Sequence, residues 1–120
     1  MVVNMMGSLE HPIEYDGFTL IDMRVGRVVR VEDFPKAKNP SYKIWVDFGE
    51  LGVKRSSAQL TKYSKDQLMN SLVIAVVNFR PKQVADFMSE VLILGVDDES
   101  NSSVVTIRPD REVPLGRRVY

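Results

Sequence analysis

The feature that most restricts the fold of this chain is the continuous apolar run LVIAVVNF at residues 72–79. The run has the length of a strand and is rich in β-branched residues, so it predicts a central strand buried on both faces. The run EVLILGV at residues 90–96 has a similar character and predicts a second such strand. Between the two runs lies a basic and polar loop that contains Pro81, which stiffens the loop.

Segments that alternate between polar and apolar residues predict the other strands. In YKIWVDFG, at residues 42–49, four apolar residues share one face, whereas Trp45 lies on the other. Residues 23–31 also alternate, and Gly26 is the expected position of a bend or bulge. Three further segments are expected to form strands: residues 53–59, 104–109 and 117–120.

One short helix is expected between the third and fourth strands, in SKDQLMNS at residues 64–71. Ser64 and Gln67 have the spacing of a capping box, in which each side chain binds a free backbone N–H of the first turn. Three strands, a helix and at least two more strands predict an all-β protein with minor α content. The order matches a five-stranded Greek-key barrel of the OB-fold type, which commonly binds ligands on the face of its second and third strands.

The first 17 residues differ from the rest of the chain. They show no hydrophobic periodicity and contain Gly7, Pro12 and Gly17. We therefore expect residues 1–17 to form an N-terminal arm and residues 18–120 to form a single domain.

Several kinds of chemistry are missing from the sequence. There is no Cys, and the only His is His11 in the arm, so a Ser-His or Cys-His nucleophile pair is not expected in the domain. The glycines form neither a G-x-G-x-x-G motif nor a P-loop. The acidic cluster at residues 97–99 is interpreted as a solvated turn. We therefore expect no enzyme activity, no cofactor and no metal site.

The charged residues are distributed unevenly, although the net charge is zero. Residues 24–82 carry twelve Lys or Arg against five acids, whereas both flanking segments are acidic. A basic middle segment suits an anionic partner if its charges gather on one face. The alternative, which the sequence leaves open, is that interleaved strands scatter these charges over the surface.

No apolar run approaches the roughly 18 residues that a membrane-spanning helix requires. The start, MVVNMMGSLEHP, lacks the basic region and long apolar stretch of a signal peptide. We therefore expect a cytoplasmic protein with no membrane insertion.

The sequence resembles the tRNA-binding OB-domain family, which includes the C-terminal domain of many methionyl-tRNA synthetases and the endothelial monocyte-activating polypeptide domain. Within that family it is most similar to the CsaA-type proteins, which are described as export-related chaperones. The resemblance covers about residues 18–120, and SSAQLTKY and NFRPKQVADFMSE are its most specific segments. The matching segments are IDMRVGRVVRVEDFP (21–35), VDFGELGVKRSSAQLTKY (46–63), VIAVVNFRPKQVADFMSEVLILG (73–95) and VPLGRRV (113–119).

The resemblance implies an OB barrel extended by its terminal segments, and a symmetric homodimer with both termini at the interface. Apolar tail residues such as Ile13 and Tyr120 fit this expectation, because they need something to cover them. The implied function is that of a CsaA-like chaperone that binds unfolded or presecretory polypeptides, apolar or positively charged, in protein export. The alternative is structure-directed tRNA binding, with phosphates meeting Arg24, Arg27, Lys54, Arg55, Arg80 and Lys82.

One departure from the family pattern is informative. Typical members have Gly and Met after a Ser-Glu pair, whereas Val91 and Leu92 follow Ser89 and Glu90 here. NFRP replaces Asn-Leu-Lys-Pro, so the basic character is kept while the Gly-Met contact is lost. This departure favours the chaperone over tRNA binding.

We expect the ligand surface to lie around the loop that follows Asn78, with Arg80 and Lys82 as its rim. Asn78 and Ser89 are expected to support the loop. Phe79, Phe87 and Met88 could line a pocket near the same loop, although core filling is the favoured role for Phe79. The predicted binding residues are Trp45, Lys54, Arg55, Ser56, Ser57, Asn78, Arg80, Lys82, Phe87, Met88, Ser89 and Glu90.

Each of these residues also has a structural interpretation, which the sequence leaves open. Trp45 either stacks on a ligand or fills the core. Asn78 either contacts a ligand or anchors the loop, and Ser89 and Glu90 either meet the ligand or hold the loop by hydrogen bonds. The basic residues either bind a partner or are solvated.

Overall fold

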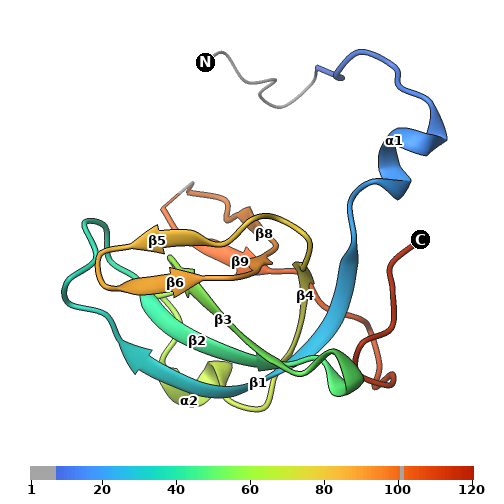
Figure 1. The fold of residues 1–120 in the computed structure, drawn as a ribbon. Coiled ribbons are helices and arrows are strands. Elements are labelled where there is room, and N and C mark those ends of the chain that lie inside the picture. Colours follow the sequence, from blue (N-terminus) through green and yellow to red (C-terminus); the bar gives the residue numbers. More distant parts are fainter. Residues whose placement is uncertain (1–7, 101) are drawn as a thin grey trace.

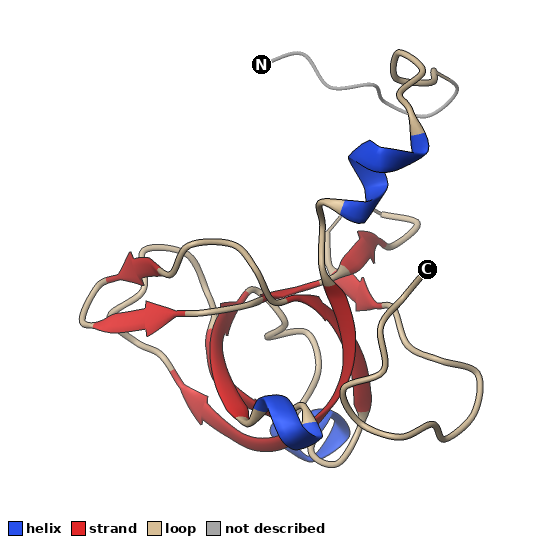
Figure 2. Cartoon of the chain, turned by 45° about the vertical axis from the view of Figure 1, so that its right-hand side comes forward, coloured by secondary structure: helices blue, strands red, loops and turns tan. Residues whose placement is uncertain are grey.

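The computed structural model describes residues 8–100 and 102–120 and is shown in Figure 1. Its body is a five-stranded antiparallel sheet in the order β3-β2-β1-β4-β7. Figure 2 shows these strands curling into a nearly closed barrel, which confirms the predicted all-β fold of the OB type. The strands are β1 (Met23–Asp33), β2 (Tyr42–Asp47), β3 (Val53–Ala58), β4 (Leu72–Val76) and β7 (Leu92–Ile93).

The core is filled by inward-facing residues of β1, β2 and β4. The alternation predicted for β2 is confirmed, because Ile44, Val46 and Phe48 are fully buried while the residues between them are partly exposed. Strand β4 pairs with both β1 and β7, as the predicted central strand should. It ends at Val76, so the last residues of the apolar run lie beyond the sheet.

The long strand β1 pairs with β2 along one part and with β4 along the other. The bulge predicted at Gly26 lies instead between Val28 and Arg30, where the register against β2 shifts. Gly26 has a different role, since a Cβ there would lie 2.4 Å from Cγ1 of Val46. The absence of a side chain at Gly26 therefore lets β1 cross close over the core.

The short helix α2 (Lys65–Leu68) lies between β3 and β4, as predicted. Its capping box is present: the Gln67 N–H donates to Ser64 Oγ at 3.1 Å, and the Ser64 N–H donates to Gln67 Oε1 at 2.7 Å. The helix is shorter than expected, because Asn70 takes a φ of 66° and its N–H donates to Val28 O. A 3₁₀ turn, η1 (Gly49–Leu51), joins β2 to β3.

The apolar run at residues 90–96 is not one strand, which corrects the prediction. It divides into β7 and β8 (Gly95–Asp97), and β8 forms a separate hairpin with β9 (Val104–Thr106). Val96 is 55% exposed, so the second half of the run lacks the burial of β4. The C-terminal segment forms no named strand among the described residues. It lies against β1 through an isolated bridge between Arg118 and Arg24, and the Val119 N–H donates to Met23 O at 2.9 Å.

A small hairpin occupies part of the predicted loop between β4 and β7. It consists of β5 (Lys82–Val84) and β6 (Phe87–Ser89), and Figure 1 shows it standing outside the barrel. Its turn is made by Ala85, which has a φ of 51°, and Asp86. Lys36 of the β1–β2 loop binds Asp86 at 2.9 Å, so this loop and the hairpin tip lie together.

The N-terminal region contains a short helix, α1 (Tyr15–Thr19), where the sequence predicts an arm without regular structure. Figures 1 and 2 show α1 projecting away from the barrel. The first seven residues of the predicted arm lie outside the described residues. No helix in the described part of the chain is both long and apolar enough to cross a membrane.

Candidate ligand-binding site

A pocket of about 470 Å³ opens beside the outer edge of β3, and we call it the edge pocket. Its walls come from four segments: residues 37–41 of the β1–β2 loop, residues 57–59, residues 79–84 and residues 89–92. Figure 1 shows the β1–β2 loop beside the β5–β6 hairpin at this end of the barrel. The predicted binding residues that line the edge pocket are Ser57, Arg80, Lys82, Ser89 and Glu90.

Ser89 and Glu90 fasten one wall of the edge pocket to β3. Ser89 Oγ accepts the Ser57 N–H at 3.0 Å, and Glu90 Oε1 accepts the Arg55 N–H at 2.9 Å. The N–H of Glu90 in turn donates to Arg55 O at 2.7 Å. The two side chains thus accept hydrogen bonds from β3 that the backbone of a neighbouring strand would otherwise accept. This is the structural interpretation of Ser89 and Glu90 that the sequence leaves open.

The rim of the edge pocket is basic. Lys38, Arg80 and Lys82 line it and are exposed. Among residues 8–100 and 102–120, no hydrogen bond or ion pair is found for the side chains of these three residues. Sequence reasoning missed Lys38, although a lysine in the proline-rich segment DFPKAKNPS was a usable signal.

Phe79 and Leu92 give the edge pocket an apolar wall. The prediction that Phe79 fills the core is wrong, because its side chain is 51% exposed and lines the pocket. The physical reason is that β4 ends at Val76, so the alternation of the strand no longer directs Phe79 inward. Leu92, one of the two residues that replace Gly-Met, is 48% exposed.

The predicted aromatic residues hold the hairpin and do not line the pocket. Phe87 is buried and makes edge-to-face contacts with Phe34 and Trp45, at centroid distances of 5.6 and 5.8 Å. Arg30 covers the Trp45 ring at 4.4 Å. Met88 is 38% exposed but also lies outside the pocket lining. This cluster therefore fixes the β5–β6 hairpin against β1 and β2.

Three further predicted residues on β3 lie outside the edge pocket. Ser56 is 1% exposed and points into the core, so it is not available to a ligand. Arg55 pairs with Glu90 at 3.5 Å and lies 5.2 Å from the Phe87 ring. Lys54 is partly exposed on the same strand but does not reach the pocket.

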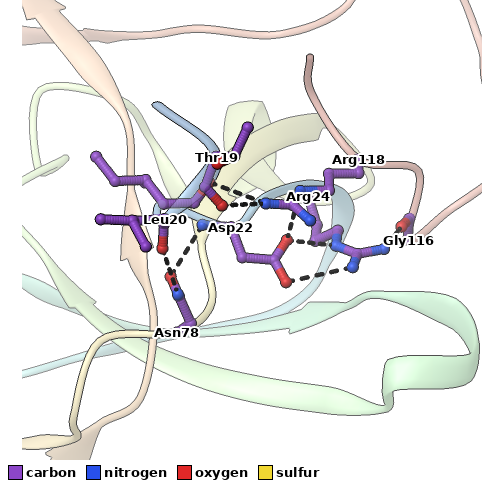
Figure 3. Close-up of polar contacts among 8 residues, drawn as sticks. Thr19, Leu20, Asp22, Arg24, Asn78, Gly116 and Arg118 are labelled. Carbon is purple, nitrogen blue, oxygen red and sulfur yellow. Dashed lines mark hydrogen bonds and ion pairs between the residues drawn. The ribbon is translucent and has the colours of Figure 1, made fainter. Parts of the chain in front are cut away.

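Asn78 is a structural anchor for the segment that leads from α1 into β1. Figure 3 shows its amide between two backbone groups of this segment. Asn78 Oδ1 accepts the Asp22 N–H at 3.0 Å, and its Nδ2 donates to Leu20 O at 2.9 Å. Both ends of the amide are therefore engaged, and Asn78 lies outside the pocket lining.

Asp22, Arg24 and Arg118 form a charged group beside Asn78, and we call these four residues the arm-root cluster. Arg24 donates to both carboxylate oxygens of Asp22, at 2.6 and 3.2 Å, and Arg118 Nε lies 3.6 Å from Asp22 (Figure 3). The hydrogen bonds from Arg24 hold the pKa of Asp22 below its usual value. Arg118 also donates to Thr19 O at 2.8 Å, which ties the C-terminal segment to the end of α1.

Two of the arginines assigned to phosphates in the tRNA alternative are engaged within the chain. Besides Asp22, Arg24 binds Gly116 O at 2.9 Å. Arg27 donates to Asn70 O at 2.7 Å and pairs with Glu112. The phosphate contacts assigned to Arg24 and Arg27 would therefore have to compete with bonds that these side chains already make within the chain.

The central carboxylate of the acidic turn after β8 is hydrogen-bonded to residues of the same turn. Asp98 accepts hydrogen bonds from the hydroxyls of Ser100 and Ser103, at 2.8 and 2.6 Å, and these bonds lower its pKa. In the part of the chain that the structure describes, no group of three or more His, Cys, Asp or Glu side chains has an arrangement that could hold a metal ion.

Comparison with known proteins places this geometry in a family. Residues 23–118 match the family described as "Putative tRNA binding domain". The chain is 38% identical over 114 residues to the methionine–tRNA ligase of Thermococcus onnurineus, which covers 94% of this chain and 15% of the ligase. It is 36% identical to the ligase of Pyrococcus abyssi, over 89% of this chain and 14% of that protein. The chain thus spans about one seventh of the length of these relatives.

Solved structures extend the comparison to whole chains. The CsaA chaperone protein of Picrophilus torridus is 46% identical, with a TM-score of 0.85, and covers 91% of this chain and 100% of its own. The chaperone CsaA of Bacillus anthracis is 42% identical, with a TM-score of 0.85, over 92% and 100%. The family match spans residues 23–118, from the start of β1 to beyond β9. This chain therefore belongs to the tRNA-binding domain family, with CsaA chaperones among its close structural relatives.

Proposed function

We propose that the chain binds extended, partly apolar polypeptide segments in the edge pocket and acts as a cytoplasmic chaperone of unfolded or presecretory proteins. The observation that carries the proposal is that Phe79 and Leu92 remain about half exposed on one wall of the pocket. Covering apolar surface is favourable by about 25 cal/mol per Å². The identity of 42–46% to proteins named CsaA chaperones supports the same ligand class.

The basic rim narrows the choice of client. The resemblance implies apolar or positively charged clients, but Lys38, Arg80 and Lys82 repel basic segments. Glu90 does not offset them, because its negative charge is paired with the Arg55 guanidinium, at 3.5 Å. The proposal therefore favours apolar segments that carry acidic residues.

The test follows the aggregation of the insulin B chain after a reductant breaks the insulin disulfides. The reductant does not alter this protein, because it contains no Cys. At a stoichiometric amount we expect light scattering to fall strongly, and we expect Leu92→Asp to remove this protection. The matched control is Val96→Asp, since Val96 is similarly exposed, at 55%, but lies outside the edge pocket.

Unchanged aggregation with the unaltered protein contradicts the chaperone proposal. Equal loss of protection in Leu92→Asp and Val96→Asp assigns the activity to a surface other than the edge pocket. Circular dichroism of both variants shows whether the barrel is intact.

A second candidate function is tRNA binding, and the family match together with the free cations of the rim supports it. With Arg24 and Arg27 engaged elsewhere and Arg55 paired with Glu90, the remaining candidates for phosphate contacts are Lys54, Arg80 and Lys82. Three phosphates predict a slope of about −2 to −3 for the logarithm of affinity against the logarithm of salt concentration. A flat salt profile, or equal affinity for an unrelated DNA duplex, rejects this candidate.

The proposal includes a homodimer that buries the N-terminal arm, residues 1–17. In the described part of the arm, Leu9 is 95% exposed and Ile13 is 76% exposed, and Tyr120 at the other terminus is 99% exposed. Exposed apolar residues in both tails are consistent with burial against a second copy. We expect sedimentation equilibrium to detect a dimer that dissociates when residues 1–17 are deleted. A tight dimer after this deletion contradicts the role of the arm.

A further inference from the structure

The outer edge of β3 is only partly hydrogen-bonded. In a strand, the N–H and C=O of one residue point to the same side, and successive residues alternate. The Ser57 N–H points outward, because it donates to Ser89 Oγ. The Ser57 C=O therefore points outward as well, but the nearby amides of Glu90 and Val91 both donate to Arg55 O instead.

The free part of this edge continues to Gln59. Pairing with β2 ends where Tyr42 meets Ala58, so Gln59 lies just beyond the ladder. Gln59 follows the last residue of β3 and lines the edge pocket together with Ser57. Within the described residues, no backbone hydrogen bond is found for Gln59, which is exposed. Ser57 and Gln59 thus offer an acceptor and a donor at the spacing of a strand.

A groove runs along these free groups. Ser57 and Gln59 both line the edge pocket, and Gln59 also lines a second hollow of about 390 Å³. The second hollow continues past Thr61 and Lys62 toward β9. The two hollows therefore share Gln59, directly after the end of β3, and together they extend from Ser57 toward β9. An extended segment of four or five residues is about 15 Å long.

We propose that a client polypeptide adds a short strand to the outer edge of β3 at Ser57–Gln59. The inference rests on the proposed function and states how the backbone of the client is recognised. A client N–H donates to Ser57 O, and a client C=O accepts the Gln59 N–H. Phe79 and Leu92 contact apolar side chains of the client, and the cations of the rim contact acidic ones.

The chemistry of the edge favours a polypeptide over RNA as the occupant. Alternating backbone donors and acceptors are complementary to another peptide backbone, and recognition of this kind does not depend on sequence. A chaperone for many clients requires such recognition. The same edge is guarded against permanent pairing, because Ser89 and Glu90 occupy its first half and Lys62 flanks the second.

The first experiment uses a fluorescein-labelled octapeptide of alternating leucine and glutamate, with two N-methylated versions. In one version the leucine amides are methylated, and in the other the glutamate amides. Because only alternate amides of an added strand face its partner, we expect one version to bind the full-length protein about tenfold more weakly. The other version should bind within about twofold of the unmethylated peptide.

The second experiment changes the protein at Gln59. Gln59→Pro removes the backbone donor, whereas Gln59→Ala removes the same side chain and keeps the N–H. We expect Gln59→Pro to bind the unmethylated peptide about tenfold more weakly than Gln59→Ala does. If Gln59→Pro fails to fold, the methylated peptides still decide the matter.

The outcomes separate this inference from the proposed function. If both methylated versions bind as well as the unmethylated peptide, or both weaken equally, the strand-addition inference is wrong while peptide binding stands. If the unmethylated peptide does not bind at all, or tRNA binds and the peptide does not, both proposals are overturned. A difference between the two methylated versions supports both.

Discussion

The arm-root cluster and the rim of the edge pocket draw on the same short segment, residues 78–82, and use it in opposite ways. At the arm root, both ends of the Asn78 amide are bonded, and Asp22 is shared by Arg24 and Arg118. Two residues after Asn78, Arg80 begins a rim whose cations lack partners among the described residues.

The difference separates charges that hold the fold from charges that are available to a ligand. An ion pair with two hydrogen bonds and limited exposure contributes to stability, whereas a solvated lysine or arginine contributes little. Substitutions at the arm root should therefore act on the free energy of unfolding. Substitutions at the rim should act on binding alone.

The largest expected effect is at Asp22. Asp22→Ala should lower the free energy of unfolding by about 2 kcal/mol, because Arg24 loses two charged hydrogen bonds and Arg118 loses its partner. Urea unfolding followed by Trp45 fluorescence measures this change. Asp110→Ala is the matched control, since Asp110 has no ion pair among the described residues and is exposed. Equal stability of the two variants would remove the distinction between the regions.

Charge reversal at the rim comes next. Arg80→Glu combined with Lys82→Glu should weaken binding of the alternating leucine–glutamate peptide about tenfold and leave the unfolding curve unchanged. Fluorescence anisotropy and urea unfolding measure the two properties on the same samples. Reversal of Arg108 and Arg111, which are exposed, have no ion pair among the described residues and lie outside both hollows, provides the control. A fall in stability without a fall in affinity contradicts the assignment of the rim.

A smaller effect is expected at Asn78. Asn78→Ala should lower the free energy of unfolding by about 1 kcal/mol, because two hydrogen bonds to the backbone of the arm root are lost from a solvent-accessible site. Peptide affinity should be unchanged. Proteolysis near Leu20 should become faster in this variant, and an unchanged rate would show that the amide does not anchor the arm.

The smallest expected effect is a response to acid. The pKa of Asp22 is lowered in the folded state by Arg24, so its contribution to stability is complete above the unfolded pKa, near 4, and is lost as pH falls through the lower folded pKa. Stability should therefore decline below about pH 4, and less so in Asp22→Asn. Asp86 and Asp98 also have lowered pKa values, so the variant should keep part of the decline. Identical pH profiles for the two proteins would contradict the role of the Asp22 pair.

Local signals in the sequence were enough to predict much of the barrel. The alternation around Ile44 and the capping box of Ser64 and Gln67 depend on residues close together in the chain, so the sequence predicts them well. The end of β4 is different, because nothing in the apolar run marks Val76 as its last strand residue. That missing boundary is the reason that the sequence favours a core position for Phe79.

The site was harder to predict because its contacts join distant segments. Arg24 meets Gly116, and Arg27 meets Glu112, across most of the chain, so their engagement cannot be read from spacing. Trp45 was correctly placed on the outward face of β2, but the hairpin that brings Phe87 against it could not be foreseen. Lys38 reaches the edge pocket only through the path of its loop.

The contact between Lys36 and Asp86 has a consequence for how ionic strength acts on this protein. It joins the β1–β2 loop to the hairpin tip, and both segments supply walls of the edge pocket. An exposed pair of this kind weakens as mobile ions screen it, so concentrated salt loosens the entrance whatever the ligand carries. The affinity for an uncharged ligand should then also depend on salt concentration. Lys36→Ala should abolish this dependence, because the variant lacks the ion pair.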